Sequence, residues 1–352
     1  MENGHPLQTG ALARMLDCRQ AIFGFSHSVE VTIAVTLAGG VGIFGATRST
    51  PDEIRDAMAQ IRQAVGNRTF GVNLVLPDGM PERDDRALIE AEIPAGHRAF
   101  VARIRDKYQV PPSDQPGMRS RFVRSEEMAR NQMAVVLDSS ADIIACGIGA
   151  PAELIEAARA RGKRVIALVG NPKHARRALA KGVDILVAQG YEAAAHTGRI
   201  GTFALLPQIV DMAGNVPVLA AGGVATGRHI NAAFALGAQG VWCGTPWLLT
   251  EEYALDPILQ DKLKAAGSDD TVISRADSGK TLRQIRTAWS EEWEQPDAPQ
   301  PLRMPYQDIL VGDLLGAIQR ERVKPLMHCP ASQGIAYFNQ VVTVQAVIDR
   351  LV

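Results

Sequence analysis

The sequence predicts an α/β protein built as a TIM (β/α)8 barrel, with a helical insertion after the third strand and a helical extension at the C-terminus. Two observations predict it: short apolar runs alternate with helical segments, and eight such runs occur in order. Eight β/α units in succession are typical of a closed barrel rather than of an open sheet. The expected strands are 21–25, 41–46, 70–76, 142–147, 164–169, 184–189, 216–221 and 240–244.

The helices of the barrel are predicted by their ends. The segment 29–37 fits strand or helix by pattern, but Gly39-Gly40 ends it and a strand follows, so we expect a helix. The next helix is expected to begin after Thr50, because a Thr N-cap, Pro51 at the first position and Glu53 at the third form a capping box. This helix is expected to end at about residue 65, and the other barrel helices are expected at 151–161, 172–181, 203–212 and 226–236.

Two regions depart from this rhythm. Residues 78–140 carry several prolines and many charges, with helices expected at 85–108 and 125–137. We interpret them as an insertion and a candidate lid within a barrel that spans 17–250. Residues 251–352 are expected to form a helical elaboration packed on the barrel.

Composition excludes several classes of protein. The chain has 352 residues and a net charge of −1, which argues against a nucleic-acid-binding protein. Four scattered cysteines form no C-x-x-C pair, so neither a metal site nor a disulfide framework is expected. The first 17 residues lack a signal-peptide pattern, and no apolar run is long enough to span a membrane. We therefore expect a cytoplasmic protein.

Glycines follow the last two predicted strands. The segments AAGGVATG (220–227) and CGTPW (243–247) occupy the loops that commonly bind phosphate in this fold. Glycine lets backbone N–H groups approach a phosphate, and a helix N-terminus favours the negative charge. The alternative is that these glycines only form tight turns. No G-x-x-x-x-G-K-[ST] motif occurs.

The loop after the sixth strand carries a candidate base. Gln189 and Glu192 are polar residues at the strand end, and His196 follows among small residues. An imidazole has a pKa close to neutrality and can accept a proton from a substrate. The alternative is a structural histidine that caps a turn.

Four motifs in barrel order resemble one family. They are GVNLVLP (71–77), AQGYEAAAHTG (188–198), AAGG (220–223) and CGTPWL (243–248). Together they resemble the FMN-dependent nitronate monooxygenases, formerly called 2-nitropropane dioxygenases, and related flavin enoyl-ACP reductases share them. The resemblance covers about residues 17–253 without the insertion.

The resemblance implies an FMN cofactor, a small-molecule substrate and O₂. His196 matches the catalytic histidine of the family, which binds the substrate or removes a proton from a neutral nitroalkane. The flavin accepts electrons and passes them to O₂, and the products are a carbonyl compound and nitrite. A homodimer is a possible assembly. The residues implied in cofactor binding are Phe25, Ser26, Asn73, Gln189, Ala221, Gly222, Gly223, Cys243, Gly244 and Thr245.

Some residues have two interpretations. Ala193–Ala195 stand where the family often has glycines, and alanine resists positive φ, so we expect a different loop there. The basic run 118–124 is typical of a solvated face, or else faces an anionic group such as phosphopantetheine. His27 faces either the flavin or solvent, and His229 is expected to be structural. The side chains of Cys243 and Trp242 are expected to pack in the barrel.

Two other functions remain open at this level. The same FMN site suits an NAD(P)H-dependent reductase of enoyl thioesters or quinones. A different class is a non-catalytic barrel that binds a phosphate ligand. A phosphosugar isomerase or lyase is compatible with the fold, but no lysine stands at a strand end to form a Schiff base.

Overall fold

The computed structural model describes residues 6–76 and 79–352, so Pro77 and Asp78, where a motif ends and the insertion begins, lie outside the described residues. Eight parallel strands close into a barrel in the order β1-β2-β3-β4-β5-β6-β8-β9. The predicted TIM barrel is therefore confirmed, and each strand begins within two residues of its predicted start. The strands are β1 (Ile22–Ser26), β2 (Val41–Gly45), β3 (Gly71–Val75), β4 (Ile143–Gly147), β5 (Arg164–Val169), β6 (Ile185–Gln189), β8 (Val218–Ala221) and β9 (Gly240–Cys243).

A ring of helices covers the barrel, and the predicted helix 29–37 is one of them. The Thr50 side chain accepts a hydrogen bond from the Glu53 N–H, and the Glu53 side chain accepts one from the Thr50 N–H, as the capping box requires. The helices that follow the strands are α3 (Val29–Leu37), α4 (Pro51–Val65), α7 (Glu126–Asp138), α8 (Ala152–Ala160), α9 (Pro172–Ala180), α10 (Thr202–Ala213) and α11 (Gly227–Ala235).

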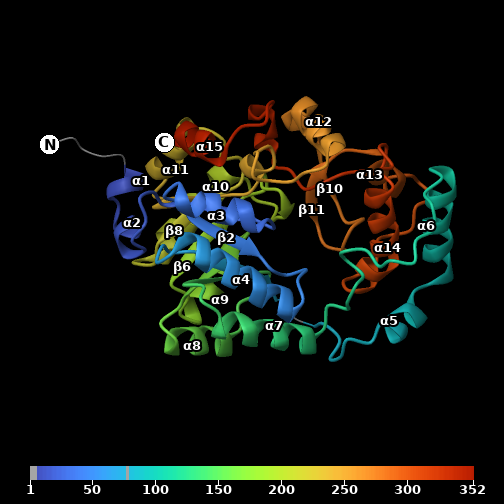
Figure 1. Ribbon diagram of the computed structural model, residues 1–352, viewed down its shortest axis with the longest axis horizontal. Helices are drawn as coiled ribbons and strands as arrows, with labels where there is room; N and C mark the ends of the chain where they lie inside the picture. The colour runs from blue at the N-terminus through green and yellow to red at the C-terminus, as the bar shows by residue number, and fades with distance from the viewer. Residues whose placement is uncertain (1–5, 77–78) are drawn as a thin grey trace.

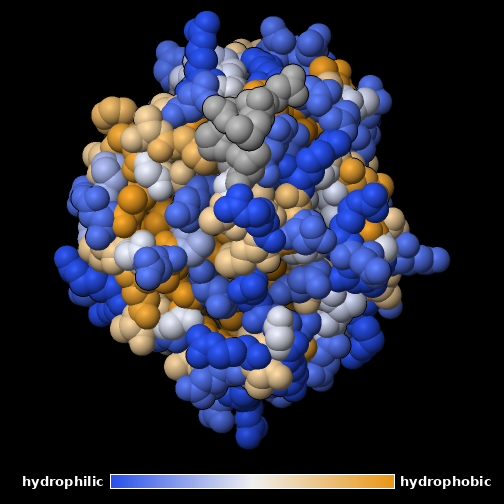
Figure 2. All heavy atoms as spheres, turned by 90° about the vertical axis from the view of Figure 1, so that its left-hand side faces the viewer, coloured by the Kyte–Doolittle hydropathy of each residue, from blue (hydrophilic) through white to orange (hydrophobic). Residues whose placement is uncertain are grey.

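The helix after β9 comes from the end of the sequence. α15 (Val344–Leu351) packs between α3 and α11, where a barrel helix that follows β9 belongs. Its residues Val344, Val347, Ile348 and Leu351 join the barrel core. Two short helices, α1 (Pro6–Thr9) and α2 (Ala11–Met15), lie on the same side of the molecule in Figure 1. Figure 2 shows that face, where apolar residues are interspersed among hydrophilic ones.

A second hydrophobic core lies beside the barrel (Figure 1). Phe100 and Ile104 of the insertion pack there with Trp289 and Trp293 and with apolar residues of α14. Segments from the insertion and from the C-terminal region thus share one core. Its helices are α6 (Ala95–Lys107), α12 (Pro257–Ala265), α13 (Ala288–Trp293) and α14 (Tyr306–Arg320). The neighbouring α5 (Arg86–Glu92) buries Ile89 in a smaller cluster with Ile309 of α14.

Three details differ from the sequence predictions. The predicted helix 85–108 is two helices, because Pro94 disfavours helical backbone at Ile93 and starts α6 as its N-cap. A small antiparallel sheet of β10 (Thr271–Ser274), β11 (Leu282–Ile285) and β7 (Ala195–His196) was not predicted. Short 3₁₀ helices span Thr245–Trp247, Ser268–Asp270 and Gln333–Tyr337.

The basic run 118–124 is not a solvated face. Arg124 is buried, and the side chain of Arg119 is only 20% exposed. Arg119 forms ion pairs with Asp277 and Asp308 of the C-terminal region, so the burial of this cation is matched by carboxylates, and Arg124 donates to the Val75 carbonyl oxygen. The interpretation as a solvated surface was wrong, because the acidic partners lie more than a hundred residues away in the sequence.

The close approach of the insertion to α14 allows a stability prediction. A Cβ added to Gly117 would lie 1.9 Å from the Gly312 carbonyl oxygen, so Gly117→Ala must displace backbone. Overpacking of this kind costs about 1–3 kcal/mol, and we expect that loss in chemical denaturation. Gly96→Ala is the matched control, since a Cβ there meets nothing within 4 Å. Equal unfolding free energies for the two variants would contradict the packing argument.

Candidate active site

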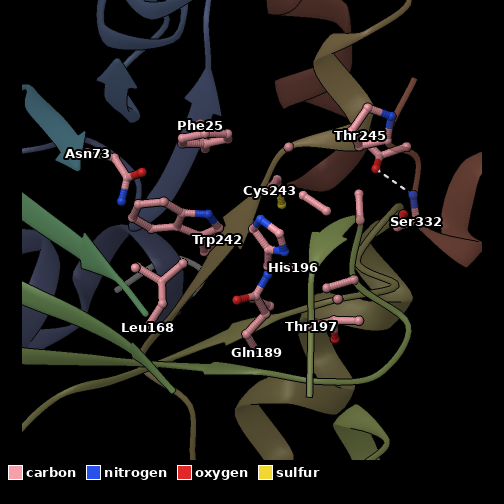
Figure 3. Close-up of a pocket in the computed structure, with 18 of the residues that line it drawn as sticks. Phe25, Asn73, Leu168, Gln189, His196, Thr197, Trp242, Cys243, Thr245 and Ser332 are labelled. Atoms are coloured by element: carbon pink, nitrogen blue, oxygen red, sulfur yellow. Dashed lines mark hydrogen bonds between the residues drawn. The ribbon is translucent and has the colours of Figure 1, made fainter. Parts of the chain in front are cut away.

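The carboxyl ends of the strands surround a cavity of about 430 Å³. Such a volume is typical of a small-molecule or cofactor site. Figure 3 shows polar and aromatic side chains from several strands around this space. Every residue that the sequence places in the site lines it: Phe25, Ser26, Asn73, Gln189, His196, Ala221, Gly222, Gly223, Cys243, Gly244 and Thr245.

The glycine loops form a cradle of backbone N–H groups. Gly222 and Gly223 have φ of +102° and +73°, values that glycine adopts at little cost. The N–H groups of Gly223, Gly244 and Thr245 make no backbone hydrogen bond within the described residues. The Thr245 Oγ accepts a hydrogen bond of 2.9 Å from the N–H of Ser332, which ties the C-terminal region to the cradle. This arrangement suits a phosphate group.

Two amide side chains stand at strand ends on the cavity wall. Asn73 of β3 is buried and donates to the Ala145 carbonyl oxygen at 3.1 Å, which fixes its orientation. Gln189 ends β6 and lines the cavity. Both amides can therefore form hydrogen bonds with the edge of a polar ring system that enters the cavity.

Aromatic rings line the barrel mouth. Trp242 stacks against Phe25, with ring centroids 5.9 Å apart, and against Phe23 at 6.3 Å. Trp242 thus packs in the barrel, as predicted, and also lines the cavity. A flat surface of this kind can stack with a planar ligand. Cys243 is buried beside it, and burial raises the pKa of its thiol to about 12, so it stays protonated.

The pairing of β7 with β11 holds His196 at the cavity wall. β7 pairs with β11, and the His196 Nδ1 lies 3.2 Å from the Thr281 carbonyl oxygen. A carbonyl can only accept, so Nδ1 carries the proton and Nε2 is an acceptor. Burial lowers the His196 pKa to about 4, and the nearby Arg119 acts in the same direction, while the hydrogen bond to Thr281 opposes them. His196 is therefore neutral at physiological pH.

The loop before His196 holds one alanine in a backbone conformation that favours glycine. Ala195 has φ of +58°, so an alanine adopts the left-handed conformation after all. Alanine resists this conformation, and the pairing of Ala195 with Arg283 of β11 holds the backbone in it. A left-handed alanine costs about 1 kcal/mol, a strain that surrounding contacts must offset.

The structure also places the two further histidines that the sequence analysis named. His27 lines the cavity, and its Nδ1 donates to the Gly45 carbonyl oxygen at 2.8 Å. Burial among protein atoms lowers the His27 pKa despite that bond. His229 is structural, because its Nδ1 accepts from the Thr226 N–H and its ring packs against Tyr337.

The C-terminal region supplies part of the cavity wall that sequence reasoning missed. Lys280, Thr281, Cys329 and Ser332 line it, whereas no described residue of the insertion does. The segment Ser278–Thr281 combines a glycine, a cation and hydroxyls, and this signal could have drawn attention to it. Ser332 acts through its backbone N–H, which leaves no trace in residue type.

Neither a metal nor a membrane site is apparent in the described part of the chain. Residues 6–76 and 79–352 contain no group of three metal-ligating side chains. Within the same ranges, every helix is too short or too polar to cross a membrane.

Comparison with known proteins identifies the family. The model of the nitronate monooxygenase family matches residues 18–352. A Mycobacterium tuberculosis protein named as a monooxygenase, Rv1533, is 41% identical over 86% of this chain and 83% of its own length. A Staphylococcus aureus protein named as a nitronate monooxygenase is 28% identical over 90% of this chain and 87% of its own.

Solved structures agree with this match. Nitroalkane oxidase from Streptomyces ansochromogenes superposes with a TM-score of 0.81 and 25% identity, and covers 97% of this chain and 96% of its own. FabK from Thermotoga maritima gives a TM-score of 0.73 and 25% identity, with 97% and 94% covered. The rim of the barrel carries the glycine cradle and His196, and the family model matches nearly the whole sequence. The chain therefore belongs to the nitronate monooxygenase family.

Proposed function

We propose that this oxidoreductase uses FMN and O₂ to oxidise nitronates, or a similarly acidic carbon beside an electron-withdrawing group. The observation that carries the proposal is a neutral His196 on the same cavity as a backbone cradle suited to phosphate. The family match and the likeness to a nitroalkane oxidase support it. When bound, FMN supplies the electron acceptor that oxidation of a carbon acid requires.

The residues fit FMN at three points. The cradle of Gly222, Gly223, Gly244 and Thr245 would hold the phosphate, and the N–H groups without a backbone partner described above would be the donors. Asn73 and Gln189 would bond to the polar edge of the ring system. Phe25 and Trp242 offer aromatic faces to a flat ring, while Ser26, Ala221 and Cys243 fill the wall beside it.

His196 would act as a base or a hydrogen-bond acceptor toward the substrate. Its protonated Nδ1 is held by Thr281, so Nε2 has the lone pair that can remove a proton from the carbon of a neutral nitroalkane. A nitronate has already lost this proton. The basic function of His196 should then matter only for the neutral form of the substrate.

The test is an absorbance spectrum of the purified protein, followed by anaerobic additions. We expect a flavin band at about 450 nm that bleaches with a nitronate and changes only slowly with NADPH. Rapid bleaching by NADPH, without a response to nitronate, would instead favour the reductase of enoyl thioesters or quinones. Failure to bind FMN after reconstitution would overturn both and leave the non-catalytic phosphate-binding barrel.

A further inference from the structure

We propose that Asp277 is a positioning residue for His196. Asp277 lies in the hairpin loop between β10 and β11, here called the anchor loop (275–281), and that loop ends in the Thr281 carbonyl that holds the His196 ring. Asp277 touches neither the cavity nor His196. The proposal rests on the proposed function of His196 as an acceptor at Nε2.

The carboxylate of Asp277 is the most heavily bonded group of the loop. It is 3% exposed and accepts hydrogen bonds from Trp289 Nε1 at 2.9 Å and from Arg119 Nη2 at 3.1 Å. His328 Nε2 lies 3.1 Å from both of its oxygens. Burial by itself would raise the Asp277 pKa, but His328 and Arg119 hold it well below its usual range. A buried charge with several donors is held in one place.

The backbone between Asp277 and Thr281 has little freedom. The Gln307 amide donates to the Ala276 carbonyl oxygen at 2.6 Å, and Arg275 Nε donates to the Gly279 carbonyl oxygen at 2.8 Å. Gly279 has φ of +75°, and a Cβ there would lie 1.9 Å from the Leu302 carbonyl oxygen. A displacement of Asp277 would therefore also displace the backbone of Thr281.

Thr281 connects the loop to the site. Its carbonyl accepts from His196 Nδ1, and its Oγ donates to the Thr197 carbonyl oxygen at 3.3 Å. The next residue, Leu282, pairs with His196 across β11 and β7. A shift of the loop would release Nδ1, and the proton could then move to Nε2, which would remove the acceptor from the cavity.

The charges around His196 favour its neutral form. Arg119 and Arg124 of the insertion lower its pKa, and Asp308 of α14 opposes them. Arg119 is shared, because it also pairs with Asp277 and Asp308. Asp277 therefore keeps in place both the carbonyl that orients the ring and the cation that disfavours its protonation.

The experiment compares Asp277→Asn with the wild type as FMN-loaded enzymes. Asparagine has nearly the same shape as aspartate, but its NH₂ group cannot accept hydrogen bonds from the buried donors. We expect kcat for a neutral nitroalkane to fall about 10–100-fold, as small misplacements of catalytic groups do, with KM and FMN content unchanged. Nitrogen-15 NMR of the ring should show Nδ1–H alone in the wild type and a mixture of tautomers in the variant, with His196→Asn giving the assignment.

Controls separate positioning from stability. Asp313, elsewhere on α14, accepts hydrogen bonds from Arg86 and Ser120 of the insertion. Asp313→Asn removes its charge, so it should lower stability without changing the tautomer of His196. Trp289→Phe removes a single donor to Asp277 and serves if Asp277→Asn fails to fold; we expect a smaller loss of the same kind. An unchanged tautomer and kcat in both variants, with only a lower Tm, would overturn the proposal. The NMR readout needs no turnover, so it stands even if nitronate oxidation is not found.

Discussion

Replacing His196 with asparagine is expected to lower kcat/KM for a neutral nitroalkane by about 10²–10⁴-fold, the range in which a general base contributes. Asparagine keeps a donor near the Thr281 carbonyl but has no basic nitrogen to face the cavity. Turnover of the preformed nitronate should fall far less, because its carbon carries no proton that must be removed. Stopped-flow reduction of the bound flavin with each form of the substrate measures the difference.

The pH dependence gives the same prediction an independent check. Because the His196 pKa lies at about 4, below the usual 6.5, the neutral base is present at every pH above that value. The wild-type profile of kcat/KM for the neutral nitroalkane should stay level from pH 8 through pH 6 and fall only as pH approaches 4. A fall centred near 6.5 would mean that His196 is not held neutral. Equal loss on both substrates would mean that it serves only in binding.

Gly223→Ala is expected to weaken FMN binding about 10–100-fold. An alanine at φ of +73° strains the turn and moves an N–H that would bond to the phosphate, and one hydrogen bond to a charged group contributes about 1.5–3 kcal/mol. Its side chain has room, since the nearest atom to an added Cβ is Glu192 Cβ at 3.6 Å. Titration of the apoprotein with FMN, followed by flavin fluorescence, measures the dissociation constant.

A matched variant isolates the cradle from backbone strain. Gly214 also has a positive φ of +59°, and a Cβ there meets nothing within 4 Å. Gly214→Ala should also lower the free energy of unfolding, by about 1–3 kcal/mol, and leave FMN affinity unchanged. If both variants lost affinity equally, the effect would arise from general destabilisation, and the phosphate would have to bind elsewhere.

The strands and helices of the barrel could be predicted from local sequence patterns. Apolar runs, the Gly39-Gly40 break and the Thr50–Glu53 capping box are signals within a few residues of the element they determine. The same holds for the cavity, since the fold alone places the ends of its strands and the loops after them on one face. Gln189, His196 and the glycine loops were found for this reason, whereas Asn73 was implied by the family resemblance.

The remaining contacts join residues that are distant in sequence. Thr281 meets His196 across 85 positions, and Arg48 meets Asp308 across 260. A two-residue strand such as β7 has no periodicity to detect. The burial of Arg119 and Arg124 depends on acceptors in other segments, so a basic run looks alike whether it faces water or Asp277 and Asp308. Such features follow from tertiary packing and leave no local pattern.

The placement of α15 bears on how the chain is made. Ribosomes deliver the strands of the barrel in order, and β9 can close against β1 long before α15 has emerged. Until then the surfaces of α3 and α11 that α15 will cover are open to water, together with the apolar side chains they carry. The nascent barrel is therefore exposed to aggregation until its last helix docks, and chaperone binding should concentrate in that interval.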